Sequence, residues 1–161
     1  MTNPSVSRLW MRFRAANPHA PEDVPLSFHF CDTKDAADIC ADLVVAGRKQ
    51  ATASSLKELE LAGLEVAQPG ELFIVTDFGG KAMAVIETTR VDIRRFGEID
   101  EDFARAEGEG DLTLEWWRDA HRAYYQRVLS GSGVAVDDDL MIACEYFRTV
   151  MTSDDGAFPL Q

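Results

Sequence analysis

The residues best suited to chemistry lie in one short segment, residues 47–52, with the sequence Gly-Arg-Lys-Gln-Ala-Thr. A lysine cation and a threonine hydroxyl stand three positions apart there, and Gly47 lets the backbone approach a ligand closely. Such a segment suits an anion or a polarised carbonyl group. Residues three apart in a regular strand point to opposite faces, so Lys49 and Thr52 can act together only if the chain bends between them. We therefore expect the strand to begin near Gln50 or Ala51.

The elements around this segment can be read from the periodicity of apolar residues. An apolar stripe predicts a helix over residues 35–46, and Gly47 suits the left-handed position that ends it. A Gly-Gly pair between two runs rich in β-forming residues predicts a hairpin. The predicted elements are helices over residues 5–16, 35–46 and 113–130, a helical turn over 57–63, and strands over 26–30, 71–78, 81–95 and 140–151. This order predicts an α+β fold in which helices pack against a curled antiparallel sheet or barrel.

Two features of these elements have alternative interpretations. Arg90 and Arg94 lie on one face of a predicted strand together with Asp92, which fits a solvated face, or a cationic stripe for a phosphate. His121 shares a face of the late helix with Trp117, which favours a buried histidine in the core over a catalyst, although histidine is the side chain best suited to proton transfer near pH 7.

The composition restricts the class of protein. A chain of 161 residues with 46% hydrophobic and 27% charged residues predicts one globular domain, with a helical extension over residues 1–25 and a flexible tail over 152–161. No apolar run approaches a membrane span, and residues 1–14 do not resemble a signal peptide, so we expect a cytoplasmic protein with no membrane partner.

The net charge, the cysteines and the histidines narrow the partners and cofactors that we expect. The net charge of −12 argues against duplex DNA as a partner. A protein that binds long duplexes by neutralising their phosphates needs a positively charged surface. The cysteines at positions 31, 40 and 144 form no C-x-x-C pair and fit reduced thiols. The three histidines show no metal-ligand spacing, so we expect neither a metal nor another cofactor.

Three segments together resemble the ASCH domain family, whose fold is related to the PUA RNA-binding fold. They are the helix exit with Gly47-Arg48-Lys49 and Thr52, the strand Ala-Val-Ile-Glu-Thr-Thr at residues 84–89, and residues 107–118, Glu-Gly-Glu-Gly-Asp-Leu-Thr-Leu-Glu-Trp-Trp-Arg. The resemblance covers most of the chain from about residue 28 to residue 150. It implies a PUA-like β-barrel with a cleft for RNA or a nucleoside, lined by Lys49.

The resemblance also implies candidate site residues. In the amidohydrolase branch of the family the active residues are a lysine, a threonine three positions later and a glutamate before the late helix, and some relatives hydrolyse N4-acetylcytidine. Lys49 and Thr52 match the first two. Aligning the late helices puts Gly110 at the third position and Glu109 one residue away from it, with Glu107 and Asp111 as the other acids that could face Lys49. The predicted catalytic residues are Lys49, Thr52 and Glu109, and the predicted ligand-binding residues are Gly47, Arg48, Glu107, Asp111 and Trp117.

Three functions remain open at this point: hydrolysis of a small modified nucleoside, binding or cleavage of short single-stranded RNA, and a non-catalytic acidic interaction domain. The net charge favours a free nucleoside over RNA, because a nucleoside needs a shaped pocket and no long cationic groove. As a base Lys49 must be neutral, which requires a dry cleft. In a wet cleft it stays a cation that holds a phosphate or stabilises an oxyanion.

Overall fold

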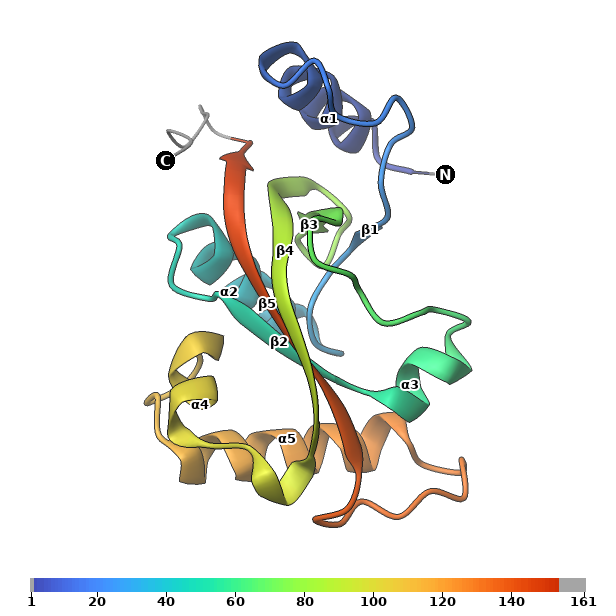
Figure 1. The fold of residues 1–161 in the computed structure, drawn as a ribbon, viewed down its shortest axis with the longest axis vertical. Helices are drawn as coiled ribbons and strands as arrows, with labels where there is room; N and C mark the ends of the chain where they lie inside the picture. Colours follow the sequence, from blue (N-terminus) through green and yellow to red (C-terminus); the bar gives the residue numbers. More distant parts are fainter. Residues whose placement is uncertain (1, 154–161) are drawn as a thin grey trace. The chain divides into compact units, whose positions relative to one another are not determined.

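The computed structural model describes residues 2–153, which form an α+β fold (Figure 1). The elements run in the order α1 (Pro4–Ala16), β1 (Ser27–Phe28), α2 (Lys34–Val45), β2 (Ala51–Ser55), α3 (Leu56–Leu61), β3 (Leu72–Thr76), β4 (Ala82–Arg95), the 3-10 turn η1 (Phe96–Glu98), α4 (Glu101–Glu107), α5 (Leu114–Val128) and β5 (Met141–Thr152). The helices and strands predicted from periodicity are confirmed with small changes of their bounds, except that the strand predicted over residues 26–30 is limited to Ser27–Phe28. Of the flexible tail predicted over residues 152–161, residues 154–161 lie outside the described part.

The five strands form one open sheet in the order β1-β3-β4-β5-β2. β3 and β4 are the predicted antiparallel hairpin, and β2 pairs antiparallel with β5. β1 pairs in parallel with β3. The closed antiparallel barrel that we expected is therefore not found in the described part of the chain. A barrel needs hydrogen bonds between its first and last strands, and the edge strand β1, with only two residues, offers few backbone groups for them.

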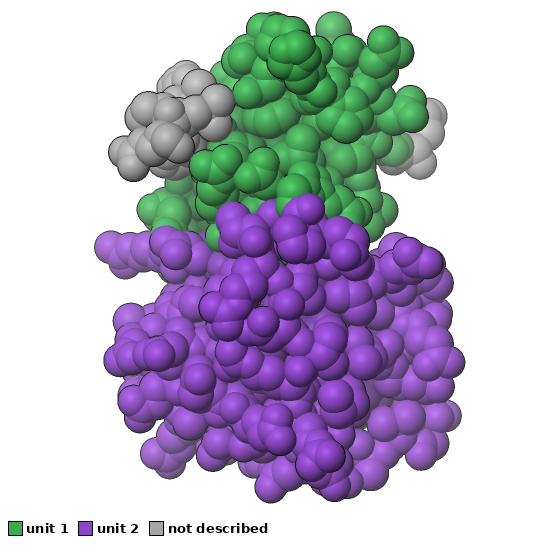
Figure 2. All heavy atoms as spheres, viewed as in Figure 1, with its two compact units in different colours: residues 1–47, 70–87, 147–161 green, residues 48–69, 88–146 purple. Residues whose placement is uncertain are grey.

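The chain divides into two compact units (Figure 2). Unit 1 comprises residues 1–47, 70–87 and 147–161, and unit 2 comprises residues 48–69 and 88–146. In unit 1, α1 packs its apolar face, with Trp10 and Phe13, into one buried cluster, and α2 packs Cys40 and Val44 into another. The expectation of a single domain stays a prediction.

Unit 2 has a core rich in aromatic side chains, built mainly from α4, α5 and the strands β2 and β5. Helices α4 and α5 lie next to each other, and α4 also contacts β2 (Figure 1). The rings of Phe96 and Phe103 pack against the buried indole of Trp117. The hydroxyl of Tyr125, also buried, donates to the carbonyl oxygen of Ala53 at 2.8 Å. This core excludes water from the inner face of α5.

Helix α4 is not marked by apolar periodicity, because seven residues are too few to repeat the helical pattern. The N-terminus of α4 is nevertheless marked by a residue next to it in the sequence. The side chain of Asp100 accepts a hydrogen bond from the backbone N–H of Phe103 at 2.9 Å, as a helix cap does. Phe103 is buried and packs α4 against the core of unit 2. Gly108, with a φ of 71°, ends it in the left-handed conformation.

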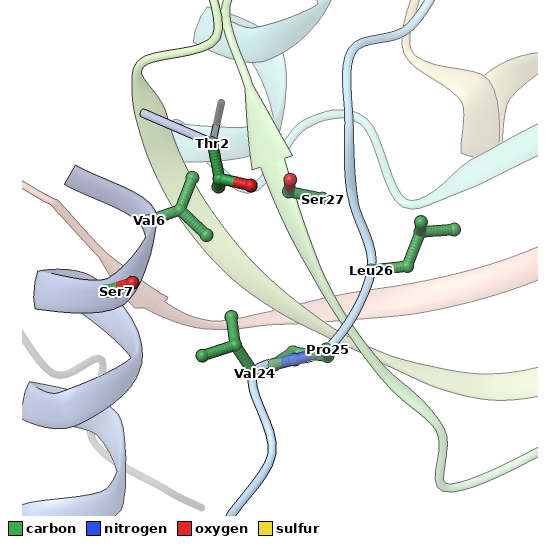
Figure 3. A pocket seen from close by; sticks show the side chains of 7 residues that line it. All are labelled: Thr2, Val6, Ser7, Val24, Pro25, Leu26 and Ser27. Carbon is green, nitrogen blue, oxygen red and sulfur yellow. The ribbon is translucent and has the colours of Figure 1, made fainter. Parts of the chain in front are cut away.

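A depression of about 350 Å³ on unit 1 is lined by Thr2, Val6, Ser7, Val24, Pro25, Leu26 and Ser27, whose side chains Figure 3 shows. Its side chains offer hydroxyl groups but no titratable group, and none of the predicted site residues lines it. No helix in the described part of the chain combines the length and the apolar character needed to cross a bilayer.

Candidate functional site

The chain at residues 48–50 is held directly against the end of helix α4. The backbone N–H of Gln50 donates to the carbonyl oxygen of Ala106 at 2.7 Å. A Cβ atom on Gly108 would lie 2.5 Å from the carbonyl oxygen of Arg48, a distance that only a glycine allows. This close approach brings Lys49 beside the acidic residues that follow α4.

Lys49 is a buried cation whose side chain is 1% exposed. Its ammonium nitrogen Nζ donates to Glu109 Oε1 at 2.9 Å and to the carbonyl oxygen of Ala51 at 2.9 Å. It also lies 3.8 Å from Glu107 Oε1. Strand β2 begins at Ala51, so Lys49 lies just before the strand, as the sequence predicted. The position of the ammonium group is therefore fixed by two hydrogen bonds.

Glu107 is the buried carboxylate at the centre of the site. Its Oε2 atom accepts a hydrogen bond from the indole Nε1 of Trp117 at 3.0 Å and lies 2.9 Å from Nε2 of His121. Its Oε1 atom accepts no hydrogen bond from any described residue. Burial by itself raises the pKa of this carboxyl. The charges of Lys49 and His121, with the hydrogen bonds from His121 and Trp117, outweigh burial and lower the pKa to about 2.

His121 lies one helical turn after Trp117 on α5. Its ring stacks on the Trp117 indole, with centroids 4.1 Å apart, and its Nδ1 atom lies 2.8 Å from the Trp117 carbonyl oxygen. Burial lowers the pKa of this imidazole, but the charge and hydrogen bond of Glu107 raise it more strongly, so that the pKa lies above its usual value. The aromatic stacking and the contact with Glu107 make His121 part of the site.

Four of the predicted site residues come together in this cluster: Lys49, Glu107, Glu109 and Trp117. Of the three acids that the sequence offered as the partner of Lys49, Glu109 is the nearest and Glu107 the next. We refer to Lys49, Glu107, Glu109, Trp117 and His121 as the Lys49 cluster. All five belong to unit 2.

The other predicted residues lie elsewhere. Asp111 is exposed and accepts hydrogen bonds from the backbone N–H and hydroxyl of Thr113, at 2.9 and 2.6 Å, so it supports the start of α5. Arg48 is exposed, and Gly47, with a φ of 74°, ends α2 as predicted. Thr52 pairs with Glu145 in the middle of the β2–β5 ladder, and its hydroxyl makes no hydrogen bond with any described residue. The structure thus shows no direct contact that would make Thr52 part of the cluster.

Sequence reasoning assigned His121 to the core and missed its contact with Glu107. One signal was present: the four-residue spacing places His121 directly above Trp117 on the helix, and a buried indole N–H requires an acceptor nearby. The acceptor comes from α4, which sequence periodicity does not mark. Without α4 the carboxylate that pairs with His121 could not be named.

The arginines of strand β4 do not form a stripe of unpaired cations. Arg90 and Arg94 both form ion pairs with Asp92, and Arg94 also lies 3.4 Å from Asp100. The guanidinium of Arg90 lies over the ring of Tyr146, 4.8 Å from its centroid. This surface is therefore a largely neutralised strand face.

Glu107, Glu109 and His121 place oxygen and nitrogen atoms within 4.8 Å of one another, which is close enough to consider a metal ion. The contacts of these atoms do not fit one. Glu109 accepts from the Lys49 ammonium group, and one oxygen of Glu107 accepts from the Trp117 indole and contacts the imidazole. A divalent metal ion would have to displace these donors from both carboxylates and would be repelled by the Lys49 ammonium group. The cluster is therefore complete as a set of ion pairs.

Comparisons with known proteins support one family. The sequence model of the ASCH domain matches residues 26–151. Among solved structures, that of a protein from Enterococcus faecalis shares 27% identity with this chain, covers 93% of it and 90% of its own length, and has a TM-score of 0.84.

A second structure is of an ASCH domain from Lactobacillus crispatus, with 28% identity, coverage of 92% of this chain and 95% of its own, and a TM-score of 0.82. No curated protein matches this sequence significantly. The family match extends over most of the chain, and both structures share its fold over at least nine-tenths of each chain. This chain therefore belongs to the ASCH domain family.

Proposed function

We propose that this ASCH domain hydrolyses an amide on a small modified nucleoside, such as N4-acetylcytidine, at Lys49 and Glu109. The observation that carries the proposal is the ion pair between a buried ammonium group and a carboxylate that is 13% exposed. A lysine placed this way supplies a fixed positive charge in a buried site, where such a charge stabilises an oxyanion more strongly than it would in water. Glu109 is the member of the pair that a substrate can reach.

In the proposed reaction a water molecule adds to the carbonyl carbon of the amide, and Glu109 accepts one of its protons. The Lys49 ammonium group donates a hydrogen bond to the carbonyl oxygen as negative charge develops there. The carbon–nitrogen bond then breaks, and the proton held by Glu109 passes to the leaving nitrogen. With N4-acetylcytidine the products are acetate and cytidine.

The charges of the molecule favour a small substrate over RNA. The net charge is −12, and the arginines that could have formed a cationic groove on β4 are paired with Asp92 and Asp100. The ammonium group of Lys49 is buried, so it can contact a compound that enters the cluster but not the phosphates of a strand lying on the surface.

The test is to incubate the purified protein with N4-acetylcytidine and, separately, with a short single-stranded RNA, and to analyse the products of both by chromatography. Lys49→Met and Glu109→Gln should each lower turnover of the nucleoside by about 100-fold or more, because each removes a group that acts in the transition state. Glu115→Gln, which changes an exposed acid in the first turn of α5, is the matched control and should leave turnover unchanged.

Two results would contradict the proposal. Release of acetate at equal rates by the native protein and Glu109→Gln would exclude the assigned role of Glu109. No turnover of the nucleoside together with cleavage of the RNA would favour a ribonuclease instead.

A further inference from the structure

We propose that His121 is a positioning residue of this site: its ring, protonated on both nitrogens, neutralises Glu107 and thereby keeps Lys49 paired with Glu109. The consequence for catalysis rests on the function proposed above. The protonation of the ring does not, because it follows from the contacts of the two nitrogens.

The Nδ1 atom of His121 lies 2.8 Å from the carbonyl oxygen of Trp117. A carbonyl oxygen can only accept a hydrogen bond, so Nδ1 must carry a proton. A neutral ring with its proton on Nδ1 would present the lone pair of Nε2 to Glu107 Oε2, 2.9 Å away. Two acceptors at that distance repel each other, so a proton must lie between them.

The remaining question is whether that proton belongs to the imidazole or to the carboxyl group. Glu107 Oε2 already accepts the indole N–H of Trp117, and the Lys49 ammonium group lies 3.8 Å from Glu107 Oε1. A hydrogen bond from a donor and a nearby positive charge both favour the ionised carboxylate. The proton therefore belongs to His121, and the pair consists of an imidazolium and a carboxylate.

Three charged groups of the described residues surround His121. Glu107 faces it from α4, Glu109 acts on it from the loop that follows α4, and Lys49 lies beyond Glu107 in the segment before β2. On α5 itself the ring contacts Trp117 and lies 6.0 Å from the ring of Tyr125. Two cations and two carboxylates thus balance each other in the Lys49 cluster.

Loss of the His121 proton would disturb this balance in a definite direction. Glu107 would keep its charge but lose the positive charge that lies 2.9 Å from its Oε2 atom. Its Oε1 atom, which accepts no hydrogen bond from the described residues, lies 3.8 Å from Nζ of Lys49. A move of the ammonium group toward Glu107 would then be favourable, and it would lengthen the contact between Lys49 and Glu109. The charge of His121 therefore determines whether the Lys49 ammonium group pairs with Glu109 or with Glu107.

The first test is independent of activity. Nitrogen-15 NMR of the native protein should show both ring nitrogens of His121 protonated at pH 7, with the signal assigned by its absence in His121→Gln. The same titration should show the Lys49 ammonium signal shifting as the ring loses its proton. A neutral ring at pH 7 would overturn the proposal, whether or not the protein turns over any nucleoside.

The second test measures the pH dependence of N4-acetylcytidine turnover. The native protein should lose activity at high pH with the release of one proton. In His121→Gln the amide keeps a donor for Glu107 but cannot titrate, so this loss should vanish, and kcat should fall ~10- to 100-fold with KM nearly unchanged, as expected for a misplaced group.

His19→Gln, which replaces an exposed histidine of unit 1, is the control and should keep the native profile. A native profile in His121→Gln would refute the positioning role. If the native protein shows no turnover at all, the proposed function fails, and the NMR titration alone decides the charge of His121.

Discussion

A buried cation is costly unless its charge is paired and its donors are used. Lys49 meets both conditions: two acceptors lie 2.9 Å from Nζ, and Glu107 adds a second carboxylate at 3.8 Å. Glu107 in turn receives donors from two positions of α5. The cluster therefore depends most on the one carboxylate that contacts both cations.

This dependence predicts the effect of Glu107→Gln. The substitution would leave the cations of Lys49 and His121 with one carboxylate between them, and unpaired buried charge costs roughly 3–5 kcal/mol of folding free energy. Denaturant unfolding at pH 7 measures it. Glu98→Gln, at an exposed acid in η1, should change stability by less than about 0.5 kcal/mol. Equal, small effects of both substitutions would show that the cluster contributes little to stability.

The role of Thr52 stays a prediction and can be tested directly. Its hydroxyl makes no hydrogen bond with a described residue, and its neighbours in β2, Ala51 and Ala53, point into the core of unit 2. If water is the nucleophile, Thr52→Ala should lower turnover of the nucleoside by less than about 10-fold, far less than Glu109→Gln. A loss in Thr52→Ala that is restored in Thr52→Ser would instead identify the hydroxyl as the nucleophile.

Among the elements, α4 and the residues that follow it determine where the acids lie. Gly108 ends α4 with a positive φ, and this turn allows the backbone to pass close to Arg48. The two carboxylates of the cluster come from either side of this glycine. The geometry of the site is therefore set by a backbone contact as much as by side chains.

Gly108→Ala tests this contact. A methyl group there would lie 2.5 Å from the carbonyl oxygen of Arg48, and the left-handed backbone adds a cost of about 1 kcal/mol. We expect a loss of about 2–4 kcal/mol in unfolding free energy. Gly63→Ala has a similar φ of 69° but no atom within 4 Å of the added methyl group, so it should show only the backbone cost. Equal losses in the two variants would contradict a close approach at Gly108.

For the whole molecule, the shifted pKa values predict that the free energy of unfolding falls at both low and high pH. The pKa of Glu107 is lowered from 4.5 to about 2, so its contribution is complete above about pH 4.5 and is lost as the pH falls through 2. The pKa of His121 is raised from 6.5, so its contribution is complete below pH 6.5 and is lost as the pH rises through the raised value.

Unfolding free energies measured from pH 2 to pH 10 should therefore pass through a maximum between these limits. In His121→Gln the decline caused by this histidine on the alkaline side should be absent, while the acid limb remains. If His121→Gln lost stability at high pH as the native protein does, the loss would have to come from another titratable group.

The elements around Lys49 were predictable because their signals are local. The apolar stripe of α2, the glycine that ends it, the Gly-Gly hairpin and the long last strand each depend on residues that are neighbours in sequence. These signals also placed Lys49 just before a strand. The open sheet was not predictable, because alternating residues mark strands without showing whether the first and last of them pair.

The sequence by itself determined the α+β class and the ASCH family, and it named Lys49 and Glu109 among the candidate site residues. Only the tertiary structure decided that Glu109 and Glu107, and not Asp111, surround Lys49, and that His121 joins them. The physical reason is separation along the chain. Lys49 and Glu109 are 60 residues apart, and they meet because the backbone of Gly108 packs against Arg48, a contact that no sequence periodicity encodes.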